Sequence, residues 1–330
     1  MTSFRTEIQA TPASFSIDLQ DRLLTMGSCF ADQIGQKLFD YKFPTLANPL
    51  GTVYNPISIH QNLLAALQEK VMPNGLVQRD LHWFHFDFHS RWSGVHSDNL
   101  INQLNQRLTE VKSHLRQTQV IFLTYGTAWV YERLENDTIV ANCHKMPAVN
   151  FRKRLLRLEE IIQSFQEVMN QLYALQPAIK IILTVSPVRH VKDTLPLNAV
   201  SKSLLRVACH QLTMEHQNVH YFPAYEILID DLRDYRFYDR DLIHPNEVAV
   251  DYLWEKFSDT YFAAVTKDFI KEWDSIKNAL HHRPFLSGSE SHQKFLLHTL
   301  KQLQNLSNTV DVRKEIQLIQ SQLTSTNANQ

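Results

Sequence analysis

Glycine is scarce in this chain. Its 330 residues include seven glycines, whereas an average usage near 7% would give about 23. Three of the seven, Gly27, Gly51 and Gly126, lie within dense local motifs. Because so few glycines are used, we expect these three to stand where a Cβ would block a turn or the approach of a ligand.

The chain also has few cysteines, no excess of charge of one sign and no long apolar run. Cys29, Cys143 and Cys209 form no spaced metal pair and are too few for a disulfide framework, so a reducing cytoplasm fits best. The 33 basic and 34 acidic residues nearly cancel, which argues against nucleic acid as a partner. There is no N-terminal signal pattern, and no apolar run approaches the roughly 18 residues of a membrane-spanning helix, so no membrane partner is expected.

Along most of the chain, continuous apolar runs alternate with segments in which apolar residues recur at the spacing of a helix. Four apolar runs predict buried strands, at 23–26, 120–125, 179–185 and 219–222. Five helices are predicted between or beside them, at 30–39, 56–69, 98–117, 158–176 and 198–216. We expect a loop over 43–56, a half-buried strand or hairpin arm over 81–89, and a hairpin turn around 135–138. This alternation indicates an α/β fold with a doubly wound parallel sheet.

The chain changes character towards its end. Residues 246–280 are predicted to be helical. The last 40 residues are rich in Gln, Asn, Ser and Lys, with leucines and isoleucines spaced by three and four. They predict one or two amphipathic helices that pack on the domain or pair with a second chain, which would make a homo-oligomer. We therefore divide the chain into an α/β domain over 1–270 and a helical C-terminal extension over 271–330.

A Gly-Ser turn links the first predicted strand to the first predicted helix, in the sequence MGSCFA at 26–31. Such a turn puts the Ser28 hydroxyl at the carboxyl edge of the sheet, where open α/β sheets bind ligands. The N–H groups at the start of the helix point to the same place and can hold a developing oxyanion. Ser28 is therefore a candidate nucleophile. The alternative is that it only caps the helix, although Ala31 leaves no capping box.

A second segment, DRDLIHPN at 239–246, carries Asp241 and His244 three residues apart, just before a predicted helix. Because a residue before proline is held extended, His244 is expected on a short turn where the Asp241 carboxylate can accept from its Nδ1. Nε2 is then free to take a proton from a serine, as in a hydrolase triad. The alternative is a surface Asp–His pair that caps the helix.

Together, these two segments are similar to the layout of SGNH/GDSL hydrolases. More closely, the sequence resembles the GSCFA-domain family. The resemblance covers about residues 20–265 and is carried by GSCFA at 27–31, NPLGTVYNP at 48–56, YGTAW at 125–129, NCHK at 142–145, VSPVRH at 185–190, YFPAYE at 221–226 and DLRDYRF at 231–237. Residues 271–330 lie outside it.

The resemblance implies an SGNH-hydrolase-like fold, a three-layer α/β/α sandwich around a central parallel sheet. It implies Ser28 as nucleophile, His244 as base and Asp241 as the residue that orients His244. In SGNH enzymes the oxyanion is held by the N–H of the serine, the N–H of a glycine and the side chain of an asparagine. Ser28 and Gly51 match the first two donors.

The third oxyanion donor is a departure from the SGNH pattern, because the segment 126–129 reads Gly-Thr-Ala-Trp and contains no asparagine. Thr127, Asn55 and Asn142 are the candidates to replace it. Loss of one such donor typically costs about 10²–10³-fold in turnover, so the choice bears on activity.

Further polar residues are dense in the matching motifs. Cys143, His144, Lys145, Arg189 and His190 are candidates to bind an anionic or sugar group, with a purely structural role as the alternative. A second set is expected to form a salt-bridged network that positions the Asp241 loop: Arg233, Asp234, Arg236 and Asp239.

The leading hypothesis is a serine esterase that acts on an O-acylated, carbohydrate-like small molecule or glycan and needs no cofactor or metal. An O-acyltransferase with the same triad, or a catalytically weak binding protein with the same cleft, is the alternative. Cys29 as nucleophile ranks lower, because a residue one position into the helix points away from the place of Ser28. A metal enzyme built on Cys143, His144 and the histidines of 81–89 ranks lowest.

Overall fold

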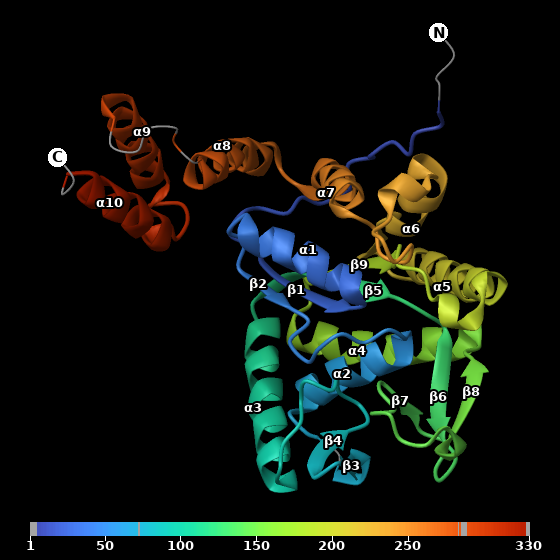
Figure 1. Cartoon of the computed structure of the whole chain (residues 1–330). Helices are drawn as coiled ribbons and strands as arrows, with labels where there is room; N and C mark the ends of the chain where they lie inside the picture. The colour runs from blue at the N-terminus through green and yellow to red at the C-terminus, as the bar shows by residue number, and fades with distance from the viewer. Residues whose placement is uncertain (1–4, 72, 283, 285–288, 328–330) are drawn as a thin grey trace. The chain divides into compact units, whose positions relative to one another are not determined.

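The computed structural model describes residues 5–71, 73–282, 284 and 289–327. Its central sheet has five parallel strands in the order β10-β9-β5-β1-β2 (Figure 1). The strands are β1 (Arg22–Gly27), β2 (Thr45–Ala47), β5 (Thr118–Tyr125), β9 (Lys180–Val185) and β10 (Val219–Tyr221). The predicted α/β fold with a doubly wound parallel sheet is confirmed.

β2 is the one strand of this sheet that the sequence does not predict. It lies inside 43–56, where a loop was expected, so that prediction is wrong for residues 45–47. Three half-buried residues between Pro44 and Asn48 are too few to form a periodic pattern. The strand exists because β1 supplies its hydrogen-bonding partner, with Leu24 opposite Leu46.

Helices cover both faces of the sheet, so the predicted three-layer sandwich is confirmed (Figure 1). One face carries α2 (Pro56–Gln68), α3 (Ser97–Leu115), α4 (Leu158–Leu175) and α5 (Leu195–Glu215). The other face carries α1 (Cys29–Asp40) and α7 (Glu247–Tyr261). Ile121 and Leu123 of β5 face the first layer. Phe122 faces the second, with its ring centroid 6.3 Å from that of Phe30 in α1 and 5.6 Å from that of Phe257 in α7.

The five helices predicted between the strands begin and end within three residues of α1 to α5. Their ends follow from local chemistry. The side chain of Asn55 accepts a hydrogen bond from the N–H of Ser58, and Pro56 takes the first position of α2. The helix ends where Glu69 turns left-handed at φ 52°.

Two small antiparallel sheets complete the α/β part. β3 (Leu76–Arg79) pairs with β4 (His82–His85), which confirms a hairpin arm within 81–89. β6 (Trp129–Arg133) pairs with β7 (Ile139–Val140) and β8 (Phe151–Leu155), and the predicted turn at 135–138 joins the first two. Short helical turns fill the remaining connections: η1 (Pro73–Gly75), η2 (Ala148–Asn150), η3 (Val191–Asp193), α6 (Ala224–Glu226), η4 (Ile227–Leu232) and η5 (Tyr235–Phe237).

The C-terminal region is helical, as predicted. The stretch 246–280 is two helices, α7 and α8 (Ala264–His281), and the last part of the chain forms α9 (Glu290–Leu306) and α10 (Arg313–Asn327). The break after α7 falls at Phe262 and Ala263, which carry none of the proline or glycine signals that mark a helix end in a sequence. Within residues 5–71, 73–282, 284 and 289–327, every helix falls short of the length or apolarity needed to cross a membrane.

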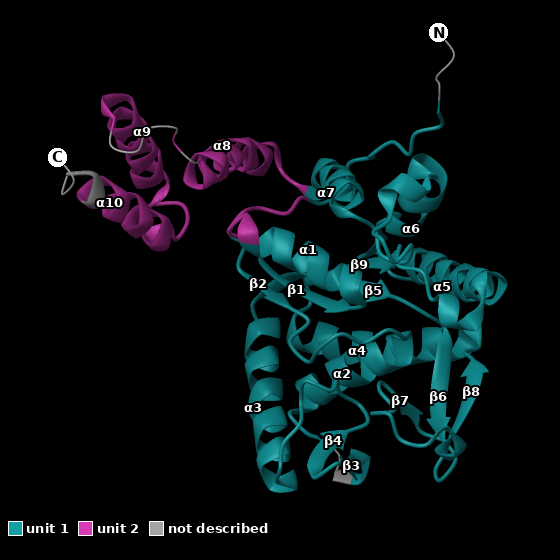
Figure 2. Cartoon of the chain, in the orientation of Figure 1, with its two compact units in different colours: residues 1–15, 20–39, 43–261 teal, residues 16–19, 40–42, 262–330 magenta. Residues whose placement is uncertain are grey.

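The chain divides into two compact units (Figure 2). The first comprises residues 1–15, 20–39 and 43–261, and the second residues 16–19, 40–42 and 262–330. The predicted boundary between 270 and 271 lies within α8. In the second unit, the buried indole of Trp273 donates to the carbonyl of Asp40, and the Tyr41 hydroxyl donates to Asp274. These contacts tie residues 40–42 to α8.

Candidate active site

The chain reverses direction in the sheet between β1 and β5. From β1 it runs to the edge strand β2, and from β5 it runs the other way, to β9 and β10. Such a reversal opens a crevice at the carboxyl ends of the two strands, where α/β proteins bind ligands. Ser28 follows β1, Gly126 follows β5 and Ser186 follows β9, so all three residues lie at this edge.

The turn at Ser28 is held by hydrogen bonds to neighbouring segments. The N–H of Gly27 donates to Asn48 Oδ1 at 2.8 Å, and the N–H of Ser28 donates to the Thr124 carbonyl at 3.1 Å. Ser28 is 1% exposed, and its hydroxyl donates to Ser186 Oγ at 2.9 Å. The N–H of Phe30 donates to Ser28 Oγ at 3.4 Å, a long hydrogen bond, so the hydroxyl also caps the start of α1.

Gly27 is expected to tolerate no side chain. Its φ is +132°, and a Cβ would lie 2.1 Å from the Thr124 carbonyl oxygen, a backbone atom of the neighbouring strand. Gly27→Ala should therefore lower the free energy of unfolding by about 3 kcal/mol, measured by urea denaturation. The control is Gly94→Ala, whose Cβ would meet nothing nearer than 3.6 Å. Equal midpoints for both variants would contradict the assignment.

Asp241 and His244 form the pair that their spacing predicts. His244 Nδ1 lies 2.6 Å from Asp241 Oδ2, on the loop between η5 and α7. Asp241 Oδ1 accepts from the backbone N–H groups of Ile243 and His244. The hydrogen bond from the His244 ring, together with these two, lowers the pKa of Asp241 to about 2. The carboxylate is therefore ionised near neutral pH and fixes the orientation of the His244 ring.

Arg189 ties this loop to the end of β9. Its N–H donates to the Ile243 carbonyl at 3.2 Å, and its guanidinium donates to the Leu242 carbonyl at 3.4 Å. The guanidinium also lies 4.0 Å above the centre of the Tyr238 ring. Arg189 follows Ser186 by three residues, so the Asp241–His244 pair and Ser28 are attached to the same strand end. The hydroxyl proton of Ser28 is directed to Ser186 rather than to His244.

Three side chains line the same edge beside Ser28. The ring of Tyr54 meets that of His190 edge-on at 5.5 Å, and its hydroxyl lies 3.7 Å from Cys29 Sγ. Burial, together with the charges of Lys202 and His244, lowers the pKa of His190 to about 3, so this imidazole is neutral near pH 7. Among the residues that the structure describes, its buried Nε2 has no hydrogen-bond partner.

The two backbone groups predicted to hold an oxyanion are already engaged. The N–H of Ser28 donates to Thr124, as described above, and the N–H of Gly51 donates to the Asn48 carbonyl at 2.9 Å. An oxyanion at this site would have to displace both bonds. The role of these N–H groups stays a prediction.

The three side chains considered for the third donor also have partners. Thr127 Oγ1 lies 3.1 Å from Ser201 Oγ and accepts from the N–H of Trp129. Asn55 caps α2 through Ser58, with both ends of its amide. Asn142 Nδ2 donates to Ser90 Oγ at 3.0 Å, and its Oδ1 accepts from the N–H of His144.

His144 belongs to a different cluster, around the β3–β4 hairpin. Its ring stacks on Phe84 at 4.9 Å, and its Nε2 lies 2.8 Å from the His85 carbonyl. It is 4% exposed, which supports the structural alternative for this residue, whereas Lys145 beside it is exposed. Burial raises the pKa of Cys143 to about 11. Within the described part of the chain, no three His, Cys, Asp or Glu side chains are grouped so that they could hold a metal ion.

Sequence reasoning missed three polar side chains of α5 that hold the loops of this edge. Asn198 Oδ1 accepts from the N–H of His190, Ser201 Oγ accepts from the N–H of Ala128, and Lys202 Nζ bonds the loops after β5 and β9. All three are buried. Their spacing indicates that they are buried, because they continue, at helical spacing, the buried stripe of α5 formed by Leu205, Ala208, Cys209 and Leu212.

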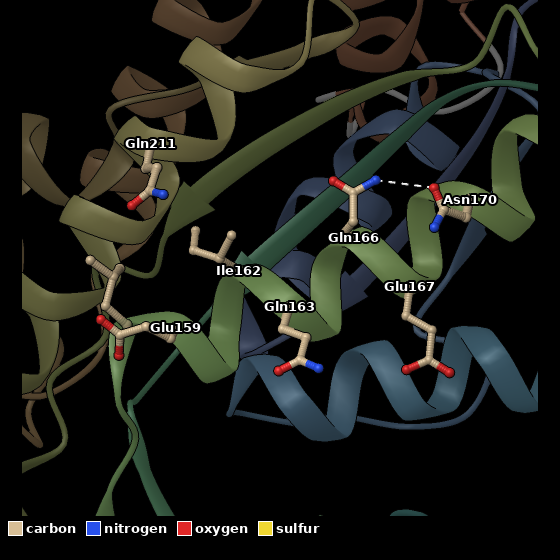
Figure 3. A pocket seen from close by; sticks show the side chains of 8 residues that line it. Glu159, Ile162, Gln163, Gln166, Glu167, Asn170 and Gln211 are labelled. Carbon is tan, nitrogen blue, oxygen red and sulfur yellow. Dashed lines mark hydrogen bonds between the residues drawn. The ribbon is translucent and has the colours of Figure 1, made fainter.

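A groove of about 650 Å³ lies elsewhere, on the outer surface of α4 and α5 (Figure 3). Gln163, Gln166, Glu167 and Asn170 of α4 line it, with Gln211 of α5. Figure 3 shows the amides of Gln166 and Asn170 bonded to each other, at 3.0 Å. None of the residues predicted for catalysis lines this groove, so it is a solvated helical surface rather than part of the site.

Comparison with solved structures finds low similarity. A putative platelet activating factor from Streptococcus pneumoniae is 14% identical, with a TM-score of 0.39 over 73% of this chain and 83% of that one. A carbohydrate esterase family 3 protein from Talaromyces cellulolyticus is 10% identical, with a TM-score of 0.34 over 78% and 99%. A family 3 carbohydrate esterase from Clostridium thermocellum is 12% identical, with a TM-score of 0.32 over 76% and 98%. These similarities are too low to carry a function across.

Comparison by sequence is more informative. No curated protein matches the chain. The model of the GSCFA family matches residues 22–257, and the model described as GSCFA domain protein, C-terminal domain, matches residues 273–325. The expectation that residues 271–330 lie outside the family resemblance is therefore wrong. The first match spans β1 to α7 and contains Ser28, Asp241 and His244. The chain therefore belongs to the GSCFA family.

Proposed function

We propose that this protein is a serine esterase in which Ser28 is the nucleophile, His244 the general base and Asp241 the residue that orients His244. The hydrogen bond of 2.6 Å between His244 Nδ1 and Asp241 Oδ2 carries the proposal. It leaves Nε2 as the nitrogen that can accept a proton. The backbone bond from Arg189 to Ile243 supports it further, because it ties the pair to the strand end that contacts Ser28.

The reaction would proceed through an acyl-enzyme. Ser28 Oγ attacks the carbonyl carbon of the ester while His244 Nε2 takes its proton, and His244 then returns that proton to the leaving alcohol oxygen. Water attacks the Ser28 ester with His244 again as base, which releases the carboxylic acid and the free serine. For the first step, the Ser28 hydroxyl must turn its proton from Ser186 Oγ to His244 Nε2, and Ser186 can keep its contact with Ser28 Oγ by donating its own hydroxyl proton.

We propose an O-acylated, carbohydrate-like molecule as the substrate class, because the sequence resembles SGNH/GDSL hydrolases at both ends of the triad. Transfer of the acyl group to another hydroxyl, rather than to water, is the second candidate. The burial of Ser28, which is 1% exposed, favours it, because a transferase must keep water away from its acyl-enzyme. Comparing hydrolysis with transfer to an added sugar would separate the two.

Labelling with a fluorophosphonate, followed by peptide mapping, tests the proposal. The wild-type protein should be modified at Ser28, and His244→Ala should abolish the label, because the reagent needs an activated hydroxyl. Absence of labelling in the wild-type protein would refute the serine mechanism, and a binding protein with the same cleft would then be the favoured alternative. Labelling at Cys29 instead would move the nucleophile by one residue.

Arg189 offers a separate test of how the Asp241 loop is held. If the Arg189 guanidinium anchors that loop, through the Leu242 carbonyl and the Tyr238 ring, Arg189→Met should lower kcat by about tenfold or more and leave KM nearly unchanged, because the base is displaced while substrate contacts remain. If Arg189 instead binds the substrate, KM should rise. Steady-state rates with p-nitrophenyl acetate distinguish the two. Arg206→Met is the matched control, since Arg206 also lies over a tyrosine ring, that of Tyr221 at 4.1 Å, but pairs with Glu226.

A further inference from the structure

Lys202 is a buried amine for which the described residues provide no counter-charge. It lies on α5, is 1% exposed, and its Nζ donates to two backbone carbonyls, that of Gly126 at 2.8 Å and that of Ser186 at 2.7 Å. Within the described ranges no carboxylate pairs with it. An unneutralised ammonium inside a protein is costly, and an apolar side chain of similar length would normally serve the fold better. Burial lowers the pKa of Lys202 to about 7. Because burying this amine is costly, we expect Lys202 to have a role that methionine at the same position could not fill.

The two carbonyls that Lys202 binds belong to the loops that follow β5 and β9. It therefore bridges the carboxyl ends of these two adjacent strands, on one side of the crevice between β1 and β5. Asn198, one turn earlier, and Ser201, the residue directly before Lys202, accept hydrogen bonds from the N–H groups of His190 and Ala128 in the same two loops. The first turns of α5 thus hold this edge of the sheet in a fixed geometry.

Ser186 links Lys202 to the nucleophile. Its N–H donates to the Tyr125 carbonyl at 2.9 Å, its carbonyl accepts from Lys202, and its hydroxyl accepts from Ser28 at 2.9 Å. Each polar group of Ser186 is therefore used to fix its position. A shift of the Ser186 backbone would move the only side chain among the described residues to which the Ser28 hydroxyl donates.

We propose that Lys202 is a positioning residue for Ser28: it fixes the backbone of Ser186, and Ser186 holds the nucleophilic hydroxyl at the start of the reaction. The inference rests on the proposed function, because it assigns Lys202 a part in the reactivity of Ser28. It adds a residue that touches neither the substrate nor the proton in transfer.

The test compares Lys202→Met with the wild-type protein in two measurements, the rate of fluorophosphonate labelling at Ser28 and steady-state hydrolysis of p-nitrophenyl acetate. Both the labelling rate and kcat should fall about 10²-fold, as for a small displacement of a reacting group, and KM should change little. Lys256→Met is the matched control. Lys256 is also largely buried, but it lies on α7 and pairs with Glu7.

A double-mutant cycle tests the route through Ser186. Ser186→Ala should lower the labelling rate as well, and Lys202→Met should cost little more when Ser186 is already alanine, because the two residues act in series. Additive losses would overturn the inference, as would full reactivity in Lys202→Met. If Lys202→Met does not fold, as judged by circular dichroism, unchanged labelling of Ser186→Ala still overturns it. A wild-type protein that is not labelled would refute the proposed function first, and this inference with it.

Discussion

His244→Ala is expected to lower kcat for ester hydrolysis by about 10⁴-fold or more, with little change in KM. The imidazole takes the proton from Ser28 and returns it to the leaving oxygen, so its loss removes stabilisation of the transition state and not of the bound substrate. Initial rates with p-nitrophenyl acetate, followed by an acetylated sugar, measure the effect. Asp241→Asn should also lower kcat, because the amide can stabilise neither the right tautomer nor the imidazolium that forms.

His82→Ala is the matched control for this prediction. His82 is exposed on the β3–β4 hairpin, and its ring contacts the Asp80 carbonyl. Its removal should leave the rate unchanged. Loss of activity in both variants would point to a general effect of histidine removal, whereas full activity in His244→Ala would refute the triad. Because the pKa of Asp241 is held at about 2, its titration should not contribute to the rate profile between pH 5 and 8.

The interior strands could be predicted because their own sequences carry the signal. β5 and β9 are buried on both faces and read as continuous apolar runs, so no knowledge of their neighbours is needed. β2 is the counterexample. Its three residues form a strand only because β1 lies beside them, and that partnership is a tertiary contact.

The same distinction separates the parts of the site. The Asp241–His244 pair spans four residues before a proline, so its geometry is local and could be read from spacing. The bond between Ser28 and Ser186 joins residues 158 positions apart, and no pattern along the chain indicates it. Arg189 is an intermediate case. The motif at 185–190 indicates it as a candidate site residue, but only the folded structure shows that it contacts the loop at Leu242.

Candidate oxyanion donors illustrate why residue type alone is insufficient. Asn55 has the right chemistry, but it stands before Pro56 at the start of α2, where an asparagine side chain caps the helix. The N–H of Gly51 is in the expected loop and is used to close a turn on Asn48. Whether a polar group is free to bind a ligand depends on partners that the sequence does not identify.

The second large effect concerns stability rather than rate: the burial of Lys202 should make the free energy of unfolding depend on pH. Its pKa is about 7 in the folded protein, because of burial, against an ordinary value of 10.5 in the unfolded chain. Between these two pH values the unfolded chain therefore binds more protons than the folded one. The free energy of unfolding must then rise with pH across this interval, and below about pH 7 this contribution must be constant.

The free energy of unfolding of the wild-type protein is thus expected to rise relative to that of Lys202→Met by up to about 5 kcal/mol between pH 7 and 10.5, at 1.36 kcal/mol for each pH unit. Urea denaturation of both proteins at several pH values in this range measures the difference, in which other titrating groups cancel. At the alkaline end the wild type should be the more stable, because its neutral amine still donates to two carbonyls that methionine leaves unpaired. Lys256→Met should give no such rise: burial lowers the pKa of Lys256, but hydrogen bonds with Glu7 and Tyr252 outweigh it and raise the pKa. A difference between wild type and Lys202→Met that is flat with pH would mean that folding does not lower the pKa of Lys202.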